Sequence, residues 1–109
     1  MKYLFLVKVD PDAEVPDEEA DPTPWLDEVS RRGARVIGER LHDASTKTVR
    51  VRNGEQLVTE GPFAESKELI GGFDVIDCAD DAEAVEIASL HPVAHFGAIE
   101  IRRFWPFEF

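Results

Sequence analysis

The dipeptide Asn53-Gly54 is the feature that most constrains how this chain can fold. A two-residue type I′ turn needs positive φ at both central positions, and Asn and Gly adopt such angles most readily. Alternating apolar and polar residues flank the dipeptide on both sides, from residue 47 to residue 59. With this turn, Val49 and Val58 lie opposite each other on one face. We therefore predict an antiparallel hairpin over residues 47–59.

The rest of the chain reads as strands and helices around that hairpin. We expect strands at residues 2–9, 34–41, 73–79 and 98–105. A short helix is expected to start at Asp21-Pro22 or at Thr23-Pro24 and to stop at Gly33, and a second helix to start at Asp80 and end before Pro92. The buried face of the first helix is expected to carry Trp25, Leu26 and Val29, and that of the second Ala82, Val85, Ala88 and Ser89. Residues 10–24 hold four of the seven prolines and a block of acids, so we expect an exposed loop there.

This order of elements predicts an α+β fold of ferredoxin-like kind, one antiparallel sheet with helices on one face. The 109 residues fit a single domain. One face of such a sheet stays open, and the C-terminal segment adds Trp105, Phe107 and Phe109. We expect a homodimer that buries sheet against sheet.

The charge of the chain excludes several classes of partner. Acidic residues number 23 against 12 Lys and Arg, which gives a net charge of −11 and no basic cluster suited to phosphates. We therefore expect no nucleic acid and no membrane as partner, since no stretch reaches the ~20 apolar residues of a span. A single cysteine, Cys78, excludes an internal disulfide and favours the cytoplasm. A buried, inert thiol is the expected state of Cys78.

The segment TEGPFAESKELIGGF, residues 59–73, is the strongest candidate for chemistry. Gly61-Pro62 fixes a turn, and Gly71-Gly72 lets the backbone bend back into the next strand. The segment between these pairs carries acids, a hydroxyl and an ammonium on a constrained turn. A small polar pocket and an ordinary solvated loop both remain open from the residues alone.

His42 is the candidate acid or base, because it follows the second strand directly and imidazole titrates near neutral pH. A surface histidine without a role is the alternative. His91 and His95 have a metal-compatible spacing, but Pro92 interrupts the helix between them, so no metal is expected. Gly71-Gly72 lacks a nucleotide-binding pattern, and no cofactor is expected.

Residues 49–77, VRVRNGEQLVTEGPFAESKELIGGFDVID, resemble the core of the YCII-related family, in the subgroup with the DGPF motif. Members typically read VRxxDGxxxVTDGPFAETKExLGGFxxI. The similarity extends to the opening KYLFLV, to GERLH before the hairpin, and to GAIEIRRFWP near the end. In this chain Glu60 stands where the motif has aspartate, which keeps a carboxylate but changes its reach.

The resemblance implies a dimeric α+β barrel with a cleft near the motif in each protomer. A His–Asp pair is suggested as catalytic in such proteins, which maps onto His42 and Glu60 here. The residues expected to bind a small-molecule substrate are Pro62, Phe63, Glu65, Ser66 and Lys67. An acid/base enzyme of unknown substrate is the leading hypothesis. A non-catalytic interaction or regulatory module is the alternative.

Overall fold

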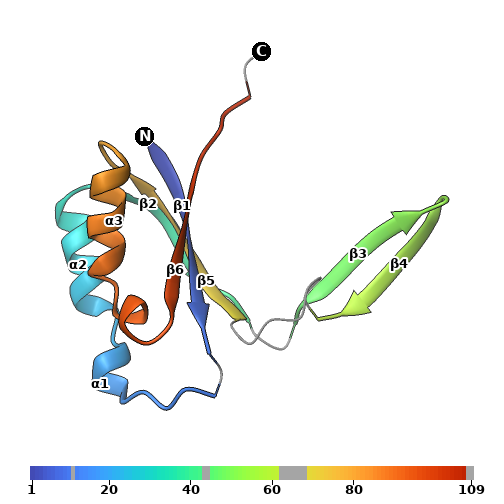
Figure 1. Ribbon diagram of the computed structural model, residues 1–109, viewed down its shortest axis with the longest axis horizontal. Helices are drawn as coiled ribbons and strands as arrows, with labels where there is room; N and C mark the ends of the chain where they lie inside the picture. The colour runs from blue at the N-terminus through green and yellow to red at the C-terminus, as the bar shows by residue number, and fades with distance from the viewer. Residues whose placement is uncertain (11, 43–44, 62–68, 108–109) are drawn as a thin grey trace.

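The computed structural model describes residues 1–10, 12–42, 45–61 and 69–107 (Figure 1). In chain order the elements are β1 (Lys2–Val9), α1 (Asp17–Ala20), α2 (Thr23–Arg31), β2 (Arg35–Arg40), β3 (Lys47–Arg52), β4 (Glu55–Glu60), β5 (Leu69–Asp77), α3 (Asp81–Ser89), the 3-10 helix η1 (Pro92–His95) and β6 (Ala98–Arg103). Four strands form an antiparallel sheet in the order β2-β5-β1-β6, and α2 and α3 cover one of its faces. The predicted α+β class is confirmed. No helix within the described ranges is long and apolar enough to cross a membrane.

The core lies between this sheet and the two long helices. Tyr3 and Phe5 of β1 are 1% and 0% exposed, and they pack in one cluster with Trp25 and Val29 of α2 and Ile87 of α3. Alternate residues of a strand point to opposite faces. The even-numbered residues of β1 therefore line the open face of the sheet, where they are only partly covered.

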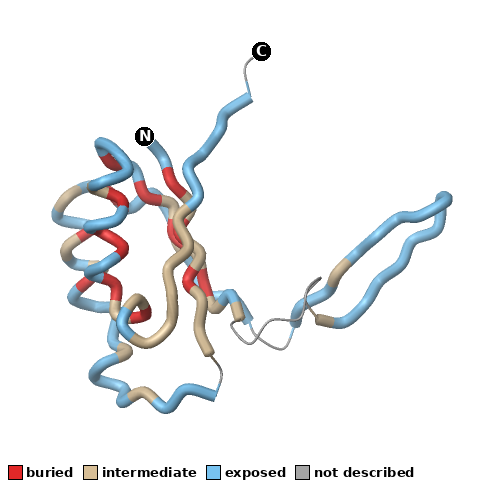
Figure 2. The backbone as a smooth tube through the Cα atoms, in the orientation of Figure 1, coloured by how far each residue is buried: buried red, intermediate tan, exposed pale blue. Residues whose placement is uncertain are grey.

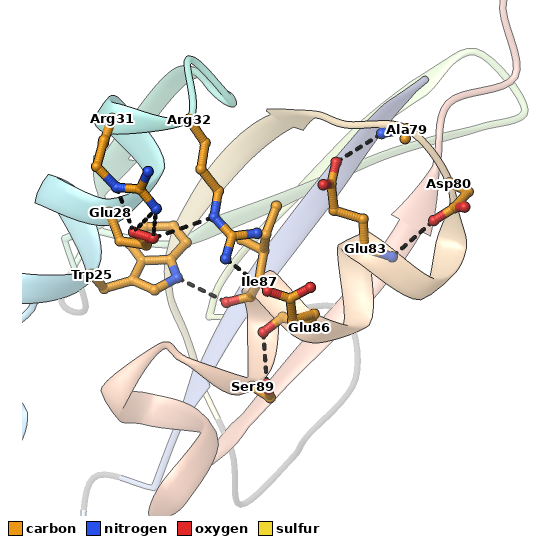
Figure 3. Close-up of polar contacts among 10 residues, drawn as sticks. All are labelled: Trp25, Glu28, Arg31, Arg32, Ala79, Asp80, Glu83, Glu86, Ile87 and Ser89. Atoms are coloured by element: carbon orange, nitrogen blue, oxygen red, sulfur yellow. Dashed lines mark hydrogen bonds and ion pairs between the residues drawn. The ribbon is translucent and has the colours of Figure 1, made fainter.

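Polar contacts join α2 to α3 over this core (Figure 3). The indole Nε1–H of Trp25 donates to the backbone carbonyl of Ile87 at 2.9 Å. The guanidinium of Arg32 reaches Glu86 at 2.7 Å and Glu28 at 3.5 Å. Arg31, and then Arg32, hold the pKa of the Glu28 carboxyl below its usual range. The two helices are thus fixed to each other by a buried hydrogen bond and an exposed ion network.

The start of α3 is capped as predicted, but of the four residues predicted for its buried face only Ala88 is buried. The backbone N–H of Glu83 donates to Asp80 Oδ1 at 2.9 Å. The buried residues are Ala84, Ile87 and Ala88, whereas Val85 is 60% exposed. Residues 84, 87 and 88 follow the i, i+3, i+4 spacing of one helix face, and Trp25 anchors that face through Ile87.

Two further boundaries differ from the prediction. The acidic segment contains α1, a single helical turn with no buried residue, inside the loop predicted for residues 10–24. Strand β5 begins at Leu69, four residues before its predicted start, so Gly71 and Gly72 lie within the strand. A Cβ at Gly72 would come within 3.0 Å of the Glu39 carbonyl oxygen. Gly72 therefore permits close approach of β5 to β2, and the two glycines do not form a bend between a loop and a strand.

The hairpin is confirmed in position and register. Asn53 and Gly54 have φ angles of 53° and 77°, and Val49 pairs with Val58. The hairpin forms a separate two-stranded sheet instead of extending the first, and it stands apart from the four-stranded sheet (Figure 1). Nearly all of its residues are exposed (Figure 2).

Candidate functional site

His42 lies just beyond the end of β2, where the chain leaves the four-stranded sheet. The backbone N–H of Leu41 donates to the Gly71 carbonyl at 2.9 Å, which holds this turn beside β5. The imidazole is exposed, and its Nδ1 lies 3.4 Å from the Oγ of Ser45. An exposed imidazole at this position is accessible to a small molecule.

Glu60 closes the base of the hairpin. Its Oε1 lies 2.7 Å from the Nζ of Lys47, its direct cross-strand partner, and both side chains are exposed. The N–H of Gly61 donates to the Thr46 carbonyl at 2.8 Å, and the hydroxyl of Thr48 donates to the Gly61 carbonyl at 2.7 Å. These bonds hold Glu60 at the point where the two strands of the hairpin return to the rest of the chain.

A short series of contacts links His42 to the residue beside Glu60. His42 contacts Ser45, the next residue Thr46 bonds to Gly61, and Gly61 follows Glu60. The predicted orientation of His42 by Glu60 stays a prediction, because the polar contact that the structure gives Glu60 is with Lys47. Lys47 is a residue that the sequence reasoning missed. The register of the Asn-Gly turn could have identified it, since that register places residue 47 opposite residue 60.

The predicted substrate-binding residues lie outside the described part of the chain. These residues are Pro62, Phe63, Glu65, Ser66 and Lys67. Their roles stay predictions.

An ion pair with a buried carboxylate, on the helix-covered side of the sheet, was also missed. Asp74 of β5 is 6% exposed, and its Oδ1 accepts from the Nε–H of Arg35 in β2 at 2.8 Å. Burial raises the pKa of the Asp74 carboxyl, and Arg35 opposes that rise. The sequence signal was an acid at an inward position of the alternating run FDVID. With its charge paired inside the sheet, Asp74 is a structural group of this fold.

The histidines near the C-terminal half each have a structural contact. The Nδ1 of His91 accepts from the Val93 N–H at 3.0 Å, and its ring meets Trp25 edge-on at a centroid distance of 4.6 Å. His95 Nε2 lies 3.0 Å from the Ser89 carbonyl oxygen. Within the ranges that the structure describes, no group of three or more His, Cys, Asp or Glu is arranged to hold a metal ion. The free thiol of Cys78 is buried, as predicted, and burial raises its pKa.

The buried position of His91 makes the stability of the protein dependent on pH. Burial lowers the pKa of His91 to about 4, below the value near 6.5 that it has in an unfolded chain. The folded state therefore binds fewer protons, and the stabilisation present above pH 6.5 is lost as the pH falls towards 4. We expect the free energy of unfolding to decrease by about 2 kcal/mol across this window.

Urea unfolding of the wild type and of a His91→Asn variant at several pH values tests this expectation. Carboxylates with lowered pKa, such as Glu28, titrate equally in both proteins, so the difference between the two profiles isolates His91. Parallel profiles between pH 6.5 and pH 4 would contradict the prediction.

Comparison with known proteins places this chain in a family. Residues 1–108 match the YCII-related domain. The chain belongs to the YCII-related family. The resemblance seen in the sequence is confirmed at this level, while the DGPF-motif subgroup stays a prediction. This YCII-related chain is also 51% identical over 52 residues to the uncharacterized protein R00369 of Rhizobium meliloti (strain 1021). That match covers 48% of this chain and 42% of the relative, so the chain spans less than half of the relative's length.

A solved structure shares the fold of this YCII-related protein. It is the 5-chloro-2-hydroxyhydroquinone dehydrochlorinase TftG of Burkholderia phenoliruptrix AC1100, in complex with 2,5-dihydroxybenzoquinone. The TM-score is 0.57 at 17% identity, and the match covers 96% of this chain and 94% of that chain. The likeness shows that the two chains share a fold.

Proposed function

We propose that this YCII-related protein is an acid/base enzyme that acts on a small, already acidic molecule at the junction of His42 and Glu60. The observation that supports the proposal is the series of contacts from His42 through Ser45 and Thr46 to Gly61, the residue that follows Glu60. Imidazole exchanges protons near neutral pH, and a carboxylate beside it stabilises its cation.

The reaction class that suits this junction is proton transfer coupled to elimination or isomerisation. His42 would take a proton from the substrate, and the electron pair of the broken bond would expel a leaving group or shift a double bond. Glu60 would orient the ring, while Pro62, Phe63, Glu65, Ser66 and Lys67 would hold the substrate. The shared fold with a dehydrochlorinase supports this class, because removal of hydrogen chloride from a hydroxylated ring is a step of this kind.

We infer that the working unit is a homodimer. Apolar residues on the open face of the sheet are only partly covered, Leu4 and Leu6 in β1 and Phe73 and Val75 in β5. Packing that face against a second copy would remove it from water, and the resemblance to dimeric α+β barrel proteins implies such a dimer. The single buried thiol, Cys78, suits the reducing conditions of the cytoplasm, where we place the protein.

Ligand-dependent thermal stability tests the proposed site with 2,5-dihydroxybenzoquinone, the compound bound to TftG, as the first probe, followed by other hydroxylated quinones. We expect such a compound to raise the melting temperature of the wild type. His42→Ala and Glu60→Gln should lose most of this shift, because each removes one half of the proposed pair. Proton-transfer assistance of this kind contributes ~10²–10⁴-fold to a rate. The turnover rate of a chlorinated analogue should therefore decrease by a factor of this size in His42→Ala.

His95→Ala is the matched control, because His95 is an exposed histidine at the 3-10 helix, and its variant should respond like the wild type. An unchanged thermal shift in both site variants would reject the assignment of His42 and Glu60. A wild type that responds to none of these compounds would favour the interaction-module alternative.

A further inference from the structure

The β3–β4 hairpin, called the arm from here on (residues 47–60), presents an apolar strip to water. Val49, Val51 and Val58 are 58%, 59% and 49% exposed. Val49 and Val58 are cross-strand partners, and Val51 lies two residues further along the same face. A two-stranded hairpin alone in water is marginally stable, so an arm with this composition needs a surface to pack against.

The total exposed area of the chain indicates how much area such a partner would cover. The chain exposes 8187 Å², whereas a compact monomer of its mass, 12.2 kDa, exposes about 6,100 Å². Its radius of gyration is 16.1 Å, against about 13 Å for a compact domain of this length. The excess of roughly 2,000 Å² lies within the range of about 1,000–2,500 Å² that one chain contributes to a permanent homodimer. A second copy of this chain is therefore the occupant that fits.

The edge of the four-stranded sheet supplies the complementary surface. Strand β2 is an edge strand, and within the described residues it pairs with β5 alone. A register shift between Arg35 and Ile37 leaves Val36 and Ile37 exposed at 54% and 51%. They are among the most exposed apolar residues of this sheet, and an uncovered apolar edge strand promotes association. Figure 1 shows that the arm projects away from its own sheet on the side opposite the helices.

We propose that the arm of each copy packs its valine strip against the β2 edge of a second copy. The exchange is symmetric, because each chain carries one arm and one β2 edge, and two copies satisfy both. This inference rests on the homodimer of the proposed function, and it names the element that completes it. The sheet faces form the centre of the interface, and the two arms enclose it.

Sedimentation velocity of the full chain tests the role of the arm. Val49→Ser/Val58→Ser should weaken dimerisation by roughly 10–100-fold, because two half-exposed valines lose their burial in the interface. Leu57→Ser is the matched control, since Leu57 lies on the other face of the arm and is the least exposed of its large apolar residues, at 36%. Circular dichroism checks that every variant stays folded.

A disulfide trap tests the specific contact. A Val58→Cys copy is mixed with a differently tagged Ile37→Cys copy and oxidised, and a cross-linked pair carrying both tags supports the proposal. The wild type, whose Cys78 is buried, should give no cross-link. Cross-linking within a single chain that carries both substitutions, or between two Val58→Cys copies only, overturns it. A wild type that sediments as a monomer overturns both the arm and the dimer.

Leu6→Glu separates the two proposals, because Leu6 lies on the open sheet face and not on the arm. Loss of the dimer in Leu6→Glu, together with an intact dimer in Val49→Ser/Val58→Ser, would leave the sheet-to-sheet dimer standing and reject the arm. The thermal-shift response to a quinone probe is measured in parallel. The absence of a thermal shift would argue against the proposed site at His42 and Glu60, and it would not bear on the proposed contact of the arm.

Discussion

Replacing Trp25 with alanine is expected to lower the free energy of unfolding by about 4 kcal/mol. Trp25 is 3% exposed, and it contributes the largest side chain of the core. Its ring lies edge-on to His91, and its indole N–H donates to the backbone carbonyl of Ile87 in α3. The substitution would therefore leave a cavity where α2 meets α3 and remove this hydrogen bond, while the Ile87 carbonyl keeps its bond from the Leu90 N–H.

Urea denaturation followed by circular dichroism measures this loss. Fluorescence does not suit the variant, because its remaining tryptophan, Trp105, is already 95% exposed in the folded state. Trp25→Phe is the control, because it keeps a ring in the core but removes the hydrogen bond to Ile87, and it should cost much less than Trp25→Ala. Equal losses in the two variants would show that the hydrogen bond, and not packing, is the dominant contribution.

Replacing Gly38 with alanine is expected to lower the free energy of unfolding by about 1–3 kcal/mol. A Cβ at this position would overlap Asp74 Oδ1 and Arg35 Nη2. The Asp74 carboxylate would have to move away from β2, and this movement would separate it from the Arg35 guanidinium. A buried charge without its partner is costly, whereas a small rearrangement on a surface is not.

Gly71→Ala is the matched control for Gly38→Ala. A Cβ at Gly71 would lie 3.1 Å from a methyl group of Val9, which can shift slightly, so the loss should be much smaller. Combining Gly38→Ala with Asp74→Ala tests the cause, because the double variant lacks the carboxylate that meets the new methyl group. A cost of Gly38→Ala that is the same with and without Asp74 would contradict the mechanism.

Local signals predicted much of the fold. The Asn53-Gly54 turn predicted the register of the hairpin, because Asn and Gly readily adopt the positive φ that a type I′ turn needs at both central residues. Asp80 predicted the start of α3, because its carboxylate accepts the Glu83 N–H. Both signals act within a few residues of the chain, so they can be read without knowledge of the tertiary structure.

Features that depend on distant partners were not predicted correctly. The buried face of α3 is set by the contact of Ile87 with Trp25, which lies 62 positions away in the sequence. The inward position of Asp74 depends on Arg35 from another strand and on the space that Gly38 leaves. At the candidate site, the roles of His42 and Glu60 stay predictions from the sequence, and the Lys47 partner of Glu60 became evident only from the paired strands.

The strand order has a consequence for the continuity of the chain. Strands β1 and β2 precede the hairpin and β5 and β6 follow it, yet the order across the sheet is β2-β5-β1-β6. The two halves of the chain thus alternate, and every neighbouring pair of strands joins one half to the other. A cut at the exposed Arg52 of the hairpin would break the chain, while all strand pairs of the four-stranded sheet would stay in place. We therefore expect two fragments divided at this position to assemble into the same sheet.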